Sequence, residues 1–210
     1  MSISNEHILN VIDPVPLIDF YQSIGVYRTE TMKKADPSGI MYLVDPILRK
    51  RFPSIDQFVG GNFYKHKKPY LPHTDHQLSW GKPSVNIVLP LWFEGTLPTL
   101  IVFDQIWKNN SVTWTMGFPK AEGKISSSTN TQMIGFPHEY DIEGRTGTEI
   151  NEQFHKDYLP LPRPWYSDLS GQAFPFVPGS AIMFDNSKIH CTGKFTGEKL
   201  GLSLRYTINI

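Results

Sequence analysis

His73 and Asp75 have the residue types and the spacing of a metal site. In an extended chain, residues i and i+2 point the same way, so this imidazole and this carboxylate converge on one point. One distant histidine would complete a 2-His-1-carboxylate face, which leaves open positions on Fe(II). His190 is the candidate, because it lies between two predicted strands near the C-terminus. The sequence therefore predicts a metal centre of His73, Asp75 and His190, which would also be the catalytic residues.

Arg205 follows His190 on the polar face of the last predicted strand, beside Ser203 and Thr207. An arginine inside a barrel is costly unless an anion meets it. Its guanidinium matches a carboxylate with two parallel hydrogen bonds, and either hydroxyl can add another. These residues predict a socket for a dicarboxylate next to the metal.

A second His-x-Asp match, His155-Lys156-Asp157, carries less weight. It lies on a predicted helix near Glu149–Tyr158, where residues i and i+2 point roughly 160° apart. We interpret it as surface.

Short strands with a period of two must position the site residues. The best candidate is 200–210, where leucine, tyrosine and isoleucine alternate with small or polar residues. The other predicted strands are 57–64, with a glycine bulge or bend, then 84–92, 100–103, 174–177 and 181–185. A short helix is expected through 17–21, ending at Gly25, and a weaker helix start at Asp45-Pro46. Without βαβ alternation, this pattern predicts a mainly β protein with few helices, an antiparallel sandwich or jelly roll.

The 210 residues form one predicted domain, with a mixed N-terminal segment at 1–55. Residues 104–172 are rich in Gly, Ser, Thr, Asn and Pro, and are predicted to be an insertion or lid.

The composition narrows the function classes. Lys+Arg and Asp+Glu are both 20, so the formal net charge is zero, which argues against a nucleic-acid partner. We expect no membrane span and no secretory signal, and the single cysteine, Cys191, suits a cytoplasmic protein. The oligomeric state is left open.

The chain resembles the Fe(II)/2-oxoglutarate-dependent oxygenases over residues 57–103 and 174–210. The resemblance rests on His73-Thr74-Asp75, on "PGSAIMFDNSKIHCTG" with His190, and on "LSLRYTIN" with Arg205. It implies a double-stranded β-helix (cupin-like) fold, iron on the three metal ligands, and Arg205 on the far carboxylate of 2-oxoglutarate. It also implies use of O₂ and release of succinate and CO₂ as a substrate is hydroxylated.

Further co-substrate contacts follow from the same resemblance. Asn62-Phe63-Tyr64 is similar to an Asn-x-Tyr motif of the DNA-dealkylating members, which implies that Tyr64 and then Asn62 contact the co-substrate. Asn86 is a third candidate, on the strand after His73-Thr74-Asp75. The substrate is expected to be a small molecule or a peptide side chain.

Two other functions fit the pattern. One is a metal-free jelly-roll binding module, for example for carbohydrate, with tryptophans as stacking platforms. The other is a cupin-type metal oxygenase that does not use 2-oxoglutarate, which would have no need of a buried Arg205.

Overall fold

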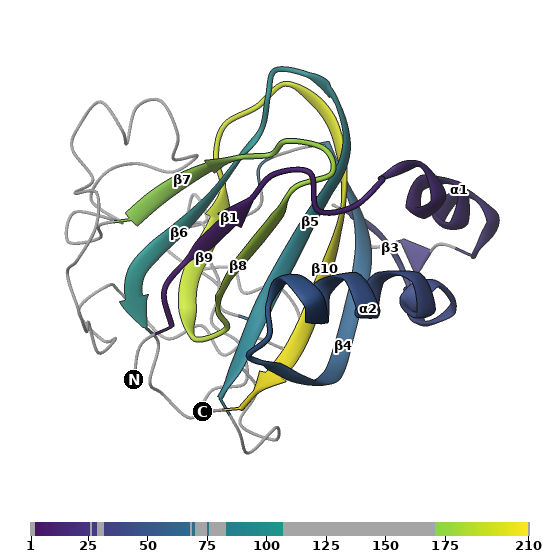
Figure 1. The fold of residues 1–210 in the computed structure, drawn as a ribbon. Helices are drawn as coiled ribbons and strands as arrows, with labels where there is room; N and C mark the ends of the chain where they lie inside the picture. Colours follow the sequence, from purple (N-terminus) through teal and green to yellow (C-terminus); the bar gives the residue numbers. More distant parts are fainter. Residues whose placement is uncertain are drawn as a thin grey trace.

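The structure is a computed structural model of the chain (Figure 1). It describes residues 3–25, 27–28, 32–67, 69, 75, 83–106 and 171–209. Two α-helices and one short 3₁₀ helix lie in this part of the chain: α1 (Val15–Ser23), α2 (Met41–Arg51) and η1 (Ser38–Ile40). Its strands are β1 (Glu6–Ile8), β2 (Tyr27–Arg28), β3 (Met32–Ala35), β4 (Ile55–His66), β5 (Ser84–Gly95), β6 (Thr99–Ile106), β7 (Gly171–Pro175), β8 (Ala181–Asp185), β9 (Lys188–Thr192) and β10 (Gly197–Ile208).

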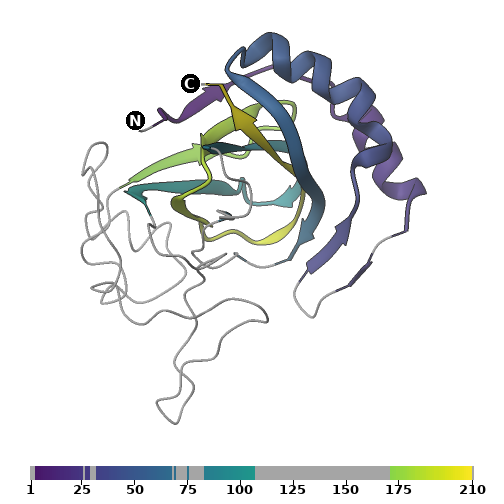
Figure 2. The same ribbon diagram turned by 90° about the horizontal axis from the view of Figure 1, so that it is seen from below.

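The strands form two antiparallel sheets that face each other, as expected for a jelly roll. The larger sheet has the order β1-β8-β5-β10-β4-β3-β2, and the smaller has the order β7-β6-β9. Seen from below, both helices lie outside the larger sheet, while the smaller sheet lies on its other side (Figure 2). The prediction of a mainly β protein with few helices is confirmed.

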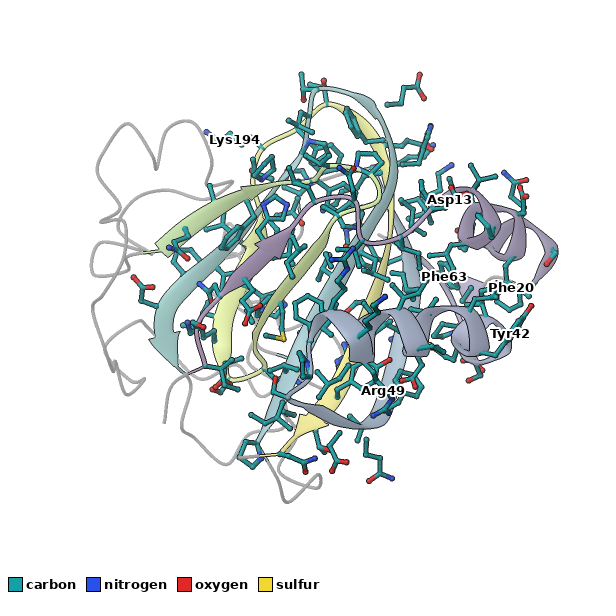
Figure 3. All side chains as sticks on the ribbon, viewed as in Figure 1. Asp13, Phe20, Tyr42, Arg49, Phe63 and Lys194 are labelled. Atoms are coloured by element: carbon teal, nitrogen blue, oxygen red, sulfur yellow. The ribbon has the colours of Figure 1, made fainter. Side chains whose placement is uncertain are left out.

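The main apolar core lies between the larger sheet and the helices. Leu202 and Leu204 of β10 are fully buried there with Leu17 of α1 and Leu48 of α2. Phe63 of β4 packs below α1, with its ring centroid 6.0 Å from that of Phe20 (Figure 3). The apolar face predicted for the last strand is therefore the face that the helices cover.

The smaller core lies between the two sheets. It contains Val88, Val102, Phe176, Ile182 and Phe184. Alternate residues of β10 point to this side, because successive side chains of a strand point to opposite faces. The polar face predicted for the last strand thus faces the interior of the jelly roll.

A β-bulge separates the two ends of the β4–β10 pair. Arg205 is paired with Gly60 and Tyr206 with Phe58, so Val59 is the extra residue. Gly60 has a φ of +153°, a conformation that side-chain-bearing residues rarely adopt. The glycine bend predicted in this strand is confirmed, and it lies directly opposite Arg205.

Several element boundaries differ from the prediction. Helix α2 begins at Met41 instead of Asp45, and Pro46 lies within its second turn. Pro46 cannot donate to the carbonyl of Tyr42, but that residue is exposed, so water can satisfy the carbonyl.

The strand predicted at 174–177 is β7, which begins and ends earlier, because its residues pair with β6 from Gly171 onward. Of the predicted insertion, 107–170 lie outside the described residues, as does the helix predicted near Glu149–Tyr158. No helix in the described part of the chain is long and apolar enough to cross a membrane.

Candidate active site

Asp75 and His190, which belongs to β9 of the smaller sheet, lie together between the two sheets. The Nε2 atom of His190 is 3.5 Å from Oδ2 of Asp75, and the two side chains are 5% and 14% exposed. An imidazole nitrogen and a carboxylate oxygen at this separation can ligate one metal ion. The third predicted ligand, His73, lies outside the described residues, so the three-residue centre stays a prediction. Among the described residues, no group of three metal-binding side chains is found.

His190 is oriented by its own strand. Its Nδ1 atom lies 3.1 Å from the carbonyl oxygen of Lys188, and its ring packs against Phe184 with centroids 4.7 Å apart. A carbonyl can only accept, so this bond places a proton on Nδ1, and in the neutral imidazole the lone pair is then on Nε2. That tautomer is the one that binds a metal through Nε2.

Asp75 is anchored by its backbone to the turn between β8 and β9. Its N–H donates to the carbonyl of Asn186 at 3.3 Å, and the Asn186 N–H donates to the carbonyl of Ser84 at 3.1 Å. The turn that precedes His190 therefore also fixes Asp75 beside the start of β5.

The carboxylate of Asp75 is held on both oxygens. Nη2 of Arg205 lies 3.1 Å from Oδ1 in an ion pair, and Nδ2 of Asn86 donates to Oδ2 at 2.7 Å. Ser203 in turn donates to Oδ1 of Asn86 at 2.8 Å. The structure thus brings together five of the predicted site residues: Asp75, Asn86, His190, Ser203 and Arg205.

Arg205 has unused hydrogen-bonding capacity toward the interior. Its Nε atom is buried and has no hydrogen-bond partner among the described residues. A buried donor without an acceptor is costly, which fits a site that an acceptor oxygen of a ligand completes.

Tyr64 and Asn62 face the same interior from β4. Tyr64 is paired with Gly201, and Asn62 with Ser203. A Cβ at position 201 would lie 2.5 Å from the Tyr64 hydroxyl, so only glycine allows the ring this position over β10. Burial and then the charge of Asp75 raise the pKa of Tyr64, which keeps its hydroxyl protonated as a donor.

Thr207 lies apart from this group. Its hydroxyl oxygen accepts from the backbone N–H of Gln57 at 3.0 Å, which fastens β10 to β4 beyond the bulge. The proposed hydroxyl contact from this residue to a ligand stays a prediction.

Lys199 is a buried cation that the sequence analysis missed. Its side chain is 1% exposed, and Nζ donates to Oγ1 of Thr192 at 3.0 Å. Nζ also lies 4.6 Å from the ring centroid of Phe176 and 5.7 Å from those of Tyr64 and Phe195. No carboxylate of the described residues forms an ion pair with it. Burial lowers the pKa of the Lys199 amino group to about 7.

The signal for Lys199 was present in the alternation of β10. Lys199, Gly201, Ser203 and Arg205 are every second residue, so they share one face. The predicted strand began at Leu200, which left Lys199 in a loop. The register shows that the strand extends back to Gly197, where it pairs with Gly95.

Comparisons with known proteins match the fold but not the sequence. No family model and no curated protein matches the chain. HygX from Streptomyces hygroscopicus, solved with nickel and 2-oxoglutarate, superposes with a TM-score of 0.56 at 9% identity over 100% of this chain and 84% of that one. The α-ketoglutarate-dependent epimerase SnoN of nogalamycin biosynthesis gives 0.55 at 10% identity over 97% and 78%. A 2OG-Fe(II) oxygenase family oxidoreductase from Burkholderia pseudomallei gives 0.55 at 8% identity over 97% and 84%.

The chain shares the jelly-roll fold of these enzymes. The predicted fold class is therefore confirmed. At these identities the likeness extends to the fold alone, and the activity is argued from the site.

Proposed function

We propose that this protein is an Fe(II)- and 2-oxoglutarate-dependent oxygenase. The observation that carries the proposal is the pairing of Asp75 with His190 inside the jelly roll, with Nε2 turned toward the carboxylate by the Nδ1 bond. Asp75 and His190 would hold the iron, together with His73. Iron bound there would supply the redox chemistry that couples O₂ and 2-oxoglutarate to oxidation of a C–H bond, with succinate and CO₂ released.

The interior cations support a dicarboxylate as co-substrate. Lys199 and Arg205 lie on one face of β10, and both face the interior between the sheets. Arg205 is next to Asp75, so its unpartnered Nε would face the metal end of the co-substrate. Lys199 is deeper among aromatic rings and would take the far carboxylate, the role that the sequence assigned to Arg205. Tyr64, whose hydroxyl lies over Gly201 between them, would donate a further hydrogen bond.

A small molecule is the favoured substrate, ahead of a peptide side chain. SnoN has been solved with nogalamycin RO and HygX with hygromycin B, and both are small molecules. The zero net charge of this chain agrees with that class and gives no support to a nucleic acid. The outcome that we propose is hydroxylation, in the cytoplasm.

The two alternative functions, a metal-free binding module and a metal oxygenase without 2-oxoglutarate, require fewer of these site residues. A metal-free binding module has no use for a histidine whose lone pair faces a carboxylate. A metal oxygenase without 2-oxoglutarate has no use for Lys199, because a buried amine without a carboxylate partner among the described residues is costly to charge until an anion meets it.

The test is the weak visible charge-transfer band of a keto acid chelated to iron, measured without oxygen. Fe(II) and then 2-oxoglutarate are added to the protein, to Arg205→Ala and to His190→Ala. We expect a band that weakens in Arg205→Ala and is lost in His190→Ala. Absence of both band and bound iron would overturn the proposal in favour of a binding module. Bound iron without a band would indicate a metal enzyme that does not use 2-oxoglutarate.

A further inference from the structure

Asn86 connects the candidate metal ligand Asp75 to two neighbouring strands. It is paired with Arg205 of β10 on one side and with Phe184 of β8 on the other. Its side chain is 1% exposed, and both ends of its amide are engaged: Nδ2 with Asp75 and Oδ1 with Ser203. Nδ2 keeps a second hydrogen, so the co-substrate contact that the sequence predicted for Asn86 stays a prediction.

The direction of each hydrogen bond in this chain follows from chemistry. An ionised carboxylate only accepts, so Asn86 must turn its NH₂ group toward Asp75 and its oxygen toward Ser203. Ser203 must then be the donor. The Ser203 hydroxyl stabilises this orientation by donating to Oδ1, and the reverse orientation would place the amide oxygen against the Asp75 carboxylate.

We propose that Asn86 is a positioning residue that fixes the Asp75 carboxylate for metal binding, with Ser203 holding the amide in its donating orientation. The proposal rests on the proposed function, because it concerns the same metal centre. Asn86 acts on the metal only through Asp75.

Fixing the orientation of the Asp75 carboxylate requires a donor on each of its two oxygens. Arg205 binds Oδ1 from β10, and Asn86 binds Oδ2 from β5. A carboxylate held on one oxygen can still rotate about its Cβ–Cγ bond, whereas donors on both oxygens fix its plane. His190 Nε2 lies on the Oδ2 side, so Asn86 controls the oxygen next to the other ligand. Each oxygen offers more than one lone-pair direction, so these bonds are compatible with a bound metal.

The size of the effect follows from other metal sites. Removing a group that orients a metal ligand typically lowers metal affinity about 10- to 100-fold. Asn86→Leu removes the hydrogen bonds and nearly conserves the volume. Ser203→Ala leaves Asn86 in place but removes the hydrogen bond that helps to hold its amide, so we expect a smaller loss, about 3- to 10-fold.

The experiment is an anaerobic titration with Co(II) as the probe, followed by its visible absorption. We expect the dissociation constant to rise about 10- to 100-fold in Asn86→Leu, with changed band positions or intensities. Tyr206→Phe is the matched control: it removes a 3.0 Å hydrogen bond to Asp45 from the outer face of β10, the strand that carries Ser203. Its Co(II) affinity and spectrum should equal those of the unmodified protein.

The outcomes separate this inference from the proposed function. If Co(II) binding is the same in the unmodified protein and in His190→Ala, the metal centre itself is wrong. If His190→Ala loses Co(II) while folded Asn86→Leu keeps the unmodified affinity and spectrum, only the role of Asn86 is overturned. If Asn86→Leu does not fold, Ser203→Ala decides: a weaker affinity with a changed spectrum supports the positioning chain, and an unchanged affinity and spectrum overturn it.

Discussion

The two faces of β10 share one backbone but differ in what they do for the protein. The outer face places Leu202, Leu204 and Tyr206 against the helices, and all three are fully buried. The inner face places Lys199, Ser203 and Arg205 between the sheets, with Arg205 against Asp75. Because the pleat alternates side chains, stability and chemistry are encoded by consecutive residues of one strand. A substitution should therefore affect one property and leave the other nearly unchanged.

The two faces also differ in the sign of their contribution to stability. Apolar burial on the outer face stabilises the fold by roughly 25 cal/mol per Å². A buried ammonium such as Lys199 costs stability until an anion meets it. The inner face is thus a region of the fold that a ligand is expected to stabilise.

The largest effect on stability is expected for Leu204→Ala on the outer face. Removing a fully buried leucine leaves a cavity and should lower the free energy of unfolding by about 2–5 kcal/mol. Urea unfolding measures the loss. The affinity of the folded variant for 2-oxoglutarate should not change, and a large change would show that the two faces are coupled.

Lys199→Met makes the opposite test on the inner face. It keeps the length of the side chain and removes the charge, which is worth about 1.5–3 kcal/mol in a bond to a carboxylate. We expect the affinity of the iron-loaded protein for 2-oxoglutarate to fall about 10- to 100-fold, as measured by calorimetry without oxygen. Stability without ligand should stay equal or rise. The exposed Lys50→Met on α2 is the control, and equal affinities in the two variants would contradict the role of Lys199.

The pH dependence of stability and of ligand affinity tests the inner face further, because burial lowers the pKa of Lys199 from 10.5 to about 7. Between these two pH values the unfolded chain binds a proton that the folded chain lacks, so this residue makes stability rise with pH. The affinity for a dicarboxylate should fall over the same range, because the ammonium is lost. Both trends should be weaker in Lys199→Met; identical pH profiles in the two proteins would speak against this titration.

The smallest effect is expected for Tyr206→Phe. Its hydroxyl donates to Asp45, which is also bound by Arg49 on the surface of α2. Loss of this partly exposed bond should cost about 0.5–1.5 kcal/mol in thermal or urea unfolding. A larger loss of unfolding free energy would show that polar contacts on the outer face of β10 contribute to stability on the same scale as the apolar packing there.

The alternation of apolar and polar residues was enough to predict both faces of the last strand, and Gly60-Gly61 predicted the bend in β4. It did not predict which residues meet across strands, because that depends on register. Asn86 contacts Asp75 only because β5 pairs with β10 so that Asn86 is opposite Arg205. Lys199 was missed for a related reason: the strand start is set by pairing with Gly95, not by local propensity.

Helix α2 shows the same limit outside the site. Pro46 favoured a helix start near itself, yet the helix begins at Met41. Its buried residues, Val44 and Leu48, lie one turn apart on the face that packs against the sheet. Tertiary packing decided that boundary over the local preference of one residue.

The most direct measurement is a crystal structure grown without oxygen, with Fe(II) and 2-oxoglutarate, and with anomalous data at the iron edge. The account predicts an iron peak bonded to His190 Nε2 and an oxygen of Asp75, with His73 as the third protein ligand. It also predicts that the far carboxylate of 2-oxoglutarate meets Lys199. Iron bound elsewhere, or a jelly-roll interior without iron and co-substrate, would contradict it.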